Sequence, residues 1–428
     1  MGGGLIELIA YGVQDIYLTG NPQITFFKVI YRRHTNFTIE SIAQEWTGRS
    51  DKPGTCVSTI ARNGDLISDI YLELKGTTAK FKCNASVLGI TSAELEIGGQ
   101  MIDKQSGIFM ETWAELTEPN PSAKVGVVKA GRNLGALGTQ FQNMSGFGGV
   151  GNNDTATKTQ QWYVPFYFWF CKDTGLALPL IALQYHEVKL ILNHTFGTGG
   201  PMTDVTNTLW CDYIFLDTDE RRRFAQVSHE YLIEQVQEQT LHKTSSTSLK
   251  FNHPVKELIW TCDDNWTTEE ETRGGILCSG TPPDPHSSGK HIGTEGICSR
   301  TAEVYPKVYY QLRFNGHDRF DERDWRYFTR VQVWQHHSGN GGYNSNVGDS
   351  QTNTDHLNGQ LNDSIGVYSF ALKPEEHQPS GTCNFSRIDE AQFIPSGETD
   401  KNHANRIFAI NYNILRIMSG MGGLAYSN

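Results

Sequence analysis

Alternation of apolar and polar residues is the dominant pattern along this chain. In residues 66–74, Leu66 and Ile70 fall on one face of an extended backbone, whereas Asp69 and Glu73 fall on the other. Side chains of a strand point to opposite faces in turn, so this period of two predicts a β-strand with one buried face. The same reasoning predicts core strands over residues 66–74, 185–192, 210–216, 308–314 and 406–416. We expect each to bury one face and to leave the other against water or a partner.

Helical periodicity is rare by comparison. Residues 106–116 place Phe109, Trp113 and Leu116 at near-helical spacing, which predicts one helix there. Residues 5–9 are apolar enough to form a single helical turn. Long stretches rich in Gly, Asn, Ser and Thr predict large loops at about 117–160, 262–300 and 336–364. The pattern as a whole predicts an all-β protein.

Several blocks occur twice in the same order, about two hundred residues apart. Asn63–Leu66 is echoed by Asn252–Val255, and Leu95–Gly99 by Leu312–Gly316. Pro179 is echoed by Pro379, and the aromatic strand Trp210–Leu216 by Phe408–Leu415. The offsets lie between 189 residues (Asn63 to Asn252) and 217 residues (Leu95 to Leu312). A repeat of this length is too long for a solenoid unit and has the size of a whole domain.

The repeat predicts two tandem domains of one fold class. We expect an N-terminal arm at residues 1–20, a first eight-stranded antiparallel jelly roll at 21–220 and a second at 221–428, both with long loop insertions. Pattern alone leaves immunoglobulin-like sandwiches open. The lack of a Cys, Trp, Cys arrangement at the spacing of that fold weighs against them.

Composition and charge narrow the class of protein. The 428 residues contain 19% charged and 11% aromatic residues, and the net charge is −11. Few charges suit extensive subunit contacts, and the acidic balance argues against direct binding of nucleic acid. The eight cysteines have no close spacing, which predicts reduced thiols. Without a signal-peptide pattern or an apolar run of about 20 residues, we expect a soluble protein made inside a cell, with no transmembrane segment.

Three motifs carry weak hints of chemistry. Residues 146–151 fit G-x-G-x-x-G but lack the flanking strand and helix, so we expect a loop rather than a cofactor site. His186-Glu187 lacks the second histidine of a zinc-protease motif, and we expect an ordinary surface or interface pair. The set Cys278, His286, His291 and Cys298 matches no common zinc framework, so we predict no metal and no cofactor. We predict no catalytic residues and no enzyme.

Asparagine sequons are the remaining candidate sites. Asn-x-Ser/Thr occurs eight times, and four of the sequons, at Asn143, Asn153, Asn265 and Asn362, lie in predicted long loops. These four are the candidate glycosylation sites.

Several sequence blocks are more specific than any fold pattern. They are Tyr17–Lys28 (YLTGNPQITFFK), Pro179–Val188 (PLIALQYHEV), Pro379–Asp389 (PSGTCNFSRID) and Asn411–Tyr426 (NYNILRIMSGMGGLAY). The chain resembles the major capsid proteins of nucleocytoplasmic large DNA viruses, and looks most like the algal, chlorovirus-type members. The blocks stand in the correct order from about residue 10 to the C-terminus.

The resemblance implies a structural role. It implies two tandem jelly rolls per subunit and a homotrimer of pseudo-hexagonal outline that tiles an icosahedral virion shell around a membrane and the genome. It also implies contacts with neighbouring capsomers and with minor capsid proteins under the shell, and assembly in the host cytoplasm. The insertions at 117–160 and 262–305 depart from the relatives, so properties of outer loops, such as glycans or binding to host surface glycans, do not transfer.

Two further interpretations stay open at the level of sequence. A tandem jelly roll can also be a carbohydrate-binding, lectin-like protein, which would bind sugars as a monomer. Within the capsid interpretation, the apolar residues of segment 1–20 make it a candidate peg against neighbours or inner-shell proteins. Its alternative is a loosely ordered terminus.

Overall fold

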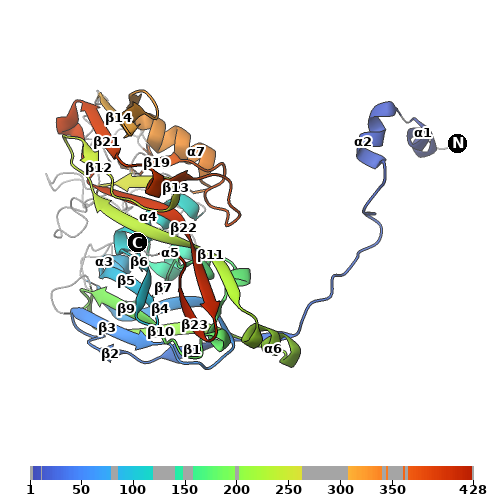
Figure 1. The fold of residues 1–428 in the computed structure, drawn as a ribbon, viewed down its shortest axis with the longest axis horizontal. Helices are drawn as coiled ribbons and strands as arrows, with labels where there is room; N and C mark the ends of the chain where they lie inside the picture. The colour runs from blue at the N-terminus through green and yellow to red at the C-terminus, as the bar shows by residue number, and fades with distance from the viewer. Residues whose placement is uncertain are drawn as a thin grey trace, which may run out of the picture. The chain divides into compact units, whose positions relative to one another are not determined.

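The computed structural model describes residues 3–10, 12–78, 85–118, 140–147, 158–197, 202–262, 307–339, 344–345, 360–361 and 365–426. The chain divides into two compact units, Met1–Phe37 and Thr38–Asn428 (Figure 1). The first unit contains α1 (Gly3–Ile9), the 3₁₀ turn η1 (Val13–Asp15) and α2 (Ile16–Thr19). All the larger sheets start at or after Phe37.

Two sheets are formed by strands up to Leu216, which we call the first roll. One has the order β1 (Phe37–Gln44), β10 (Met202–Leu216), β4 (Leu66–Thr78) and β7 (Lys158–Pro165), with β8 (Leu178–Pro179) beside β4. The other has the order β2 (Thr47–Gly48), β3 (Gly54–Thr59), β9 (Val188–His194), β5 (Ile90–Ile97) and β6 (Gln100–Gln105).

Two sheets are formed by strands from His229 onward, which we call the second roll. One has the order β11 (His229–Thr240), β22 (Arg406–Met418), β13 (Pro254–Thr261) and β19 (Gly366–Ser369), with β20 (Cys383–Asn384) beside β13 and β23 (Met421–Leu424) beside β22. The other has the order β12 (Thr247–Ser248), β21 (Ala391–Gly397), β14 (Val308–Phe314) and β15 (His317–Asp318), with β16 (Arg323–Asp324) beside β14. A separate small pair joins β17 (Asn344–Ser345) to β18 (Gln360–Leu361).

Both rolls have the same strand order. Numbered along the chain, the eight main strands of each roll lie in the order 1-8-3-6 in one sheet and 2-7-4-5 in the other. The strand pairs whose register is defined are antiparallel, as in β4–β10 and β13–β22. Each roll is therefore a jelly roll, and the prediction of two tandem eight-stranded antiparallel jelly rolls is confirmed. The sequence echoes fall at matching places, since Asn63–Leu66 and Asn252–Val255 lead into the third strand of each roll.

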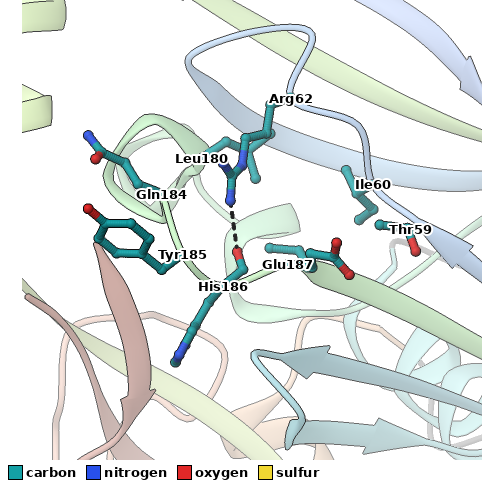
Figure 2. Close-up of a pocket in the computed structure, with 9 residues that line it drawn as sticks. Thr59, Ile60, Arg62, Leu180, Gln184, Tyr185, His186 and Glu187 are labelled. Atoms are coloured by element: carbon teal, nitrogen blue, oxygen red, sulfur yellow. Dashed lines mark hydrogen bonds between the residues drawn. The ribbon is translucent and has the colours of Figure 1, made fainter. Parts of the chain in front are cut away.

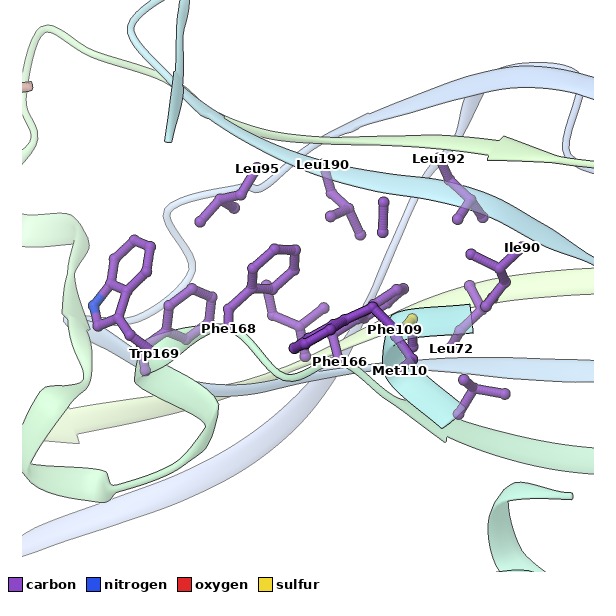
Figure 3. Close-up of a cluster of buried hydrophobic side chains, with 14 of the residues drawn as sticks. Leu72, Ile90, Leu95, Phe109, Met110, Phe166, Phe168, Trp169, Leu190 and Leu192 are labelled. Atoms are coloured by element: carbon purple, nitrogen blue, oxygen red, sulfur yellow. The ribbon is translucent and has the colours of Figure 1, made fainter. Parts of the chain in front are cut away.

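Strand β4 shows why the alternating sequence forms this fold. Ile70, Leu72 and Leu74 are fully buried, whereas Asp69 and Glu73 are half-buried on the opposite face. The buried side chains join a core that also receives the aromatic run 166–170 and helix α4 (Gly107–Thr117), as Figure 3 shows. The predicted helix at 106–116 is thereby confirmed within one residue.

The other helices lie at the ends of strands or in connections. They are α3 (Ala85–Leu88), α5 (Gln140–Ser145), α6 (Thr218–Gln226), the π-helix η5 (Tyr327–Val331) and α7 (Gln332–His336). Short 3₁₀ turns occupy η2 (Trp169–Cys171), η3 (Thr174–Leu176), η4 (Leu180–Ala182), η6 (Phe385–Arg387) and η7 (Thr399–Lys401). None of the helices in the described part of the chain is long and apolar enough to cross a membrane.

Two of the predicted strands need correction. The strand predicted at 185–192 begins only at Val188, because Tyr185 and His186 are held by a different segment, as described below. The strand predicted at 406–416 exists as β22, but it does not expose a polar face. Asn411 and Asn413 are buried, because β22 is covered on both sides.

Candidate functional site: the contact between the two rolls

Strand β22 lies between two hydrophobic cores. Ile407 and Ala409 belong to the core of the second roll, whereas Phe408 and Ile410 belong to the core that contains the first roll. The ring of Phe408 packs edge-on against Phe109 of helix α4, with centroids 5.5 Å apart. One sheet of the second roll therefore uses both faces for packing, one inside its own roll and one against the first roll.

The outer face of that sheet is apolar across several strands. Ile259 of β13 lies directly opposite Phe408 of β22 on one side and Val367 of β19 on the other. All three are fully buried and join the core of the first roll. Burying apolar surface of this kind is the main favourable term in domain association, so the two rolls form one packed body.

Buried side-chain amides form directional hydrogen bonds at the contact. Asn413 Nδ2 donates to Gln235 Oε1 at 2.9 Å, and Gln235 Nε2 donates across the contact to the carbonyl of Ile102. Next to it, Asp103 Oδ1 accepts a hydrogen bond from the Val236 amide at 2.9 Å. Burial raises the pKa of Asp103 to about 6, although these hydrogen bonds lower it in part. These bonds fix the position of β11 against β6 of the first roll.

Three charged side chains meet at the centre of the contact. Glu234 of β11 accepts from Lys256 Nζ of β13 at 2.6 Å and from Lys172 Nζ of the first roll at 2.5 Å. Lys256 is fully buried and the side chain of Glu234 is 4% exposed. Burial alone would raise the pKa of Glu234, but the two lysines outweigh it and hold the pKa at about 2. Lys172 also lies over the Trp113 ring, 4.5 Å from its centroid.

A second ionic group involves a buried histidine. His337 Nε2 lies 3.0 Å from Glu257 Oε2, and its Nδ1 lies 3.1 Å from Glu375 Oε1. Burial would lower the pKa of His337, but the two carboxylates outweigh it and raise the pKa to about 9. The imidazole is therefore a cation at neutral pH. Its ring packs edge-on against Trp113 of the first roll, with centroids 6.3 Å apart.

The residues after His337 bind the end of helix α4. Ser338 Oγ donates to the Thr117 carbonyl at 2.9 Å, and the Gly339 amide donates to the Leu116 carbonyl at 2.8 Å. These carbonyls belong to the last turn of the helix, where no intrahelical donor is available. A Cβ at Gly339 would lie 2.4 Å from the Glu115 carbonyl oxygen, so only glycine allows this approach.

The C-terminal hairpin β22–β23 binds the first roll at another point. The Tyr185 amide donates to the Gly420 carbonyl at 2.9 Å, and His186 Nδ1 lies 2.8 Å from the Gly422 carbonyl oxygen. Because these bonds hold Tyr185 and His186 against the hairpin, strand β9 begins at Val188 and not at residue 185. His186 is an interface residue, which is one of the two roles expected from the sequence.

Beside this point lies a cavity of about 310 Å³ (Figure 2). Arg62 crosses it and donates to the carbonyls of Leu183 and, at 3.2 Å, of His186. The cavity is lined by Thr59, Ile60, Arg62, Leu180, Gln184, Tyr185, His186, Glu187 and Val188. Arg62 and His186 both use their polar atoms to hold backbone, so they stabilise the loop 183–187 here.

The candidate sites from the sequence are placed only in part. Asn143 is exposed on α5, whereas Asn153, Asn265 and Asn362 lie outside the described residues. Cys278, His286, His291 and Cys298 also lie outside them, and so do the last four residues of the glycine motif 146–151. Within the described ranges, no group of three or more His, Cys, Asp or Glu side chains is placed to hold a metal ion.

The charged residues of the contact were not predicted from the sequence. Lys256-Glu257 interrupts the otherwise apolar strand 254–261, and Glu234 follows an apolar run in β11. Charges are almost never fully buried unless paired. The charges of β13, a strand with few other polar positions, were the available signal for a buried ionic contact.

Comparison with known proteins agrees with this architecture. Residues 25–217 match the family described as "Major capsid protein N-terminus". Residues 220–343 and 355–423 match the family described as "Large eukaryotic DNA virus major capsid protein". The major capsid protein of Pyramimonas orientalis virus is 44% identical over 441 residues, and that of Paramecium bursaria Chlorella virus 1 is 39% identical over 486 residues. Both alignments cover 100% of this chain and of the relative.

Solved structures show the same fold. VP54 of PBCV-1 superposes with a TM-score of 0.74 at 32% identity, covering 94% of this chain and 100% of VP54. The Faustovirus major capsid protein has a TM-score of 0.62 at 12% identity, over 95% of this chain and 94% of that chain, which shows likeness of fold alone. The resemblance noted in the sequence is confirmed, and the chain belongs to the family of major capsid proteins of large eukaryotic DNA viruses.

Proposed function

We propose that this chain is the building unit of a virus capsid shell, and that it acts as a homotrimer of pseudo-hexagonal outline. The observation that carries the proposal is the same eight-strand order present twice in one packed body. Three such chains around a threefold axis present six similar rolls, so a trimer can fill a position with six neighbours. The relatives named as capsid proteins and the PBCV-1 capsid structures support the same role.

A shell unit of this kind must hold its two rolls in a fixed relative position. A hinge between them would disturb the arrangement of six similar rolls around the threefold axis. The apolar face around Phe408, the Glu234 ion pairs and the bonds to the end of α4 supply that rigidity. The proposed role is structural and includes no catalytic step.

Further parts of the proposal concern organisation and partners. We propose an arm followed by two rolls, with the divisions expected from the sequence at 1–20, 21–220 and 221–428. Sheets that never mix strands of the two rolls among the described residues support the two rolls, and every described strand of the first roll begins at or after Phe37. Neighbouring capsomers and minor proteins under the shell are the proposed partners, and assembly is proposed to occur in the host cytoplasm. Binding of host surface glycans stays a prediction. Glycosylation also stays a prediction, and peptide mass spectrometry of purified virions would check it at Asn143, Asn153, Asn265 and Asn362.

Light scattering on the purified protein tests the trimer. We expect a single species of three times the 47.9 kDa chain mass. A stable monomer that binds sugars on a glycan array would contradict the proposal and favour a lectin-like role. A trimer without sugar binding supports the capsid role.

A further inference from the structure

The unit Met1–Phe37 exposes an unusual concentration of apolar side chains. Six of them lie within residues 24–34, which form neither helix nor strand. Their exposed fractions are 67% for Ile24, 89% for Phe26, 98% for Phe27, 70% for Val29, 73% for Ile30 and 85% for Tyr31. Within the unit Met1–Phe37 itself, none of the six is buried. So much exposed apolar surface in a short segment indicates a binding partner.

The same segment is the basic part of an acidic protein. Residues 24–34 contain Lys28, Arg32 and Arg33 and no Asp or Glu, which gives a charge of +3. The chain as a whole carries −11, so the remaining residues carry −14 (−11 minus +3). All three cations are exposed. A partner of this segment should therefore be both apolar and negatively charged.

The positions of the apolar residues favour a fluid surface over a protein groove. They occupy 24, 26, 27, 29, 30 and 31, so both faces of a strand and more than half of the circumference of a helix would carry them. A groove in a folded partner covers one face of a bound segment. The boundary region of a bilayer is fluid and adapts to irregularly spaced apolar side chains, and aromatic residues and long cations are favoured there.

Nucleic acid is the alternative anionic partner. Aromatic and basic residues together bind single strands by stacking and charge. Here three of the six apolar residues, Ile24, Val29 and Ile30, are aliphatic and cannot stack on bases. Their exposure is explained by a hydrocarbon surface and not by bases.

We propose that residues 24–34 bind the surface of an anionic bilayer as a peripheral anchor. Phe26, Phe27 and Tyr31 would enter the boundary between headgroups and acyl chains, while Lys28, Arg32 and Arg33 would contact lipid phosphates. This anchor would attach the capsid unit to a membrane without crossing it. The inference goes beyond the trimer and does not depend on it.

Vesicle flotation of the full-length protein tests the proposal. We expect flotation with phosphatidylcholine vesicles that contain phosphatidylserine, and much weaker flotation with pure phosphatidylcholine. The triple variant K28Q/R32Q/R33Q should weaken binding by about fivefold per charge, on the order of a hundredfold in total. The variant F26S/F27S should also lose flotation, since charge alone binds a bilayer only weakly.

Matched variants in the unit Thr38–Asn428 are the controls. K52Q/K250Q/R387Q removes the same number of exposed cations, and W334S/L372S removes two apolar side chains that are 79% and 76% exposed. Both control variants should float like the wild type. All four variants should keep the mass of the wild-type assembly and its unfolding temperature, which separates this test from that of the trimer.

Three results would overturn the proposal. One is a wild-type protein that does not float with anionic vesicles. Another is equal flotation of the segment variants and their controls. The third is binding of single-stranded DNA that is lost in K28Q/R32Q/R33Q, without any binding of vesicles.

Discussion

The equivalent sheets of the two rolls differ in what covers their outer faces. In the second roll, Ile259, Val367 and Phe408 make that face apolar, and the first roll covers it. In the first roll, the corresponding sheet β1-β10-β4-β7 has Trp210 paired with Tyr71 there, and both are only half-buried. The outer face of this sheet is therefore covered within the chain in the second roll but only partly covered in the first roll. We call the outer face of the first-roll sheet the incomplete face.

The incomplete face has the composition of an interface rather than of a wet surface. Trp210 Nε1 donates to Glu73 Oε2 at 2.7 Å, and Gln161 Nε2 donates to Glu73 Oε1 at 2.7 Å. Tyr71 and Tyr163 pack edge-on beside them, with centroids 6.3 Å apart. Aromatic side chains are enriched where proteins associate. If three chains arrange their six rolls around a threefold axis, this face should contact the second roll of the next chain. That contact would resemble the contact between the two rolls within one chain.

The largest expected effect concerns the covered face. Replacing Lys256 by Met removes one cation from Glu234 and leaves the buried carboxylate with Lys172 alone. Breaking a buried pair from one side costs about 3–5 kcal/mol, so the free energy of unfolding should fall by that order. Urea unfolding measures it. The control Lys373→Met breaks an exposed pair with Glu376 and should leave stability unchanged; equal curves for the two variants would show that the contact does not hold the rolls together.

An intermediate effect is expected from pH. Because the pKa of His337 is raised from 6.5 to about 9, its stabilising charge is fully present below pH 6.5 and is lost as pH rises through about 9. The pH-dependent part of the stability difference between the wild type and His337→Gln should be on the order of 3 kcal/mol at pH 6 and should vanish above pH 10. Thermal unfolding across this range checks the difference. A difference that does not change with pH would mean that Glu257 and Glu375 do not hold a protonated imidazole.

The smallest effect on a single chain, but a large one on assembly, is expected at the incomplete face. Tyr163 is 37% exposed near the edge of that sheet. Tyr163→Lys should change the unfolding free energy by no more than about 0.5 kcal/mol. It should weaken the trimer by about tenfold to a thousandfold, because an unpaired charge would be buried between chains. Trp334→Lys, at a 79% exposed position away from this sheet, is the control; equal trimer dissociation of the two on dilution would place the subunit contact elsewhere.

The sequence predicted the main strands and helix α4 but did not predict the contacts between the two rolls. Alternation located β4 and β14 and the helix at 107–117, because each follows from local spacing of apolar residues. It misjudged β22, since burial of Asn411 and Asn413 depends on Gln235 and on a neighbouring roll that local spacing cannot reveal. The ionic group around Glu234 was missed for the same reason: its members, Lys172, Glu234 and Lys256, are far apart along the chain.

Electron microscopy of the purified protein tests the central claim most directly. We predict particles with threefold symmetry and six similar lobes, in which each chain contributes two adjacent lobes and the sheet β1-β10-β4-β7 faces the next chain. Monomers, or trimers in which that sheet faces solvent, would contradict the account.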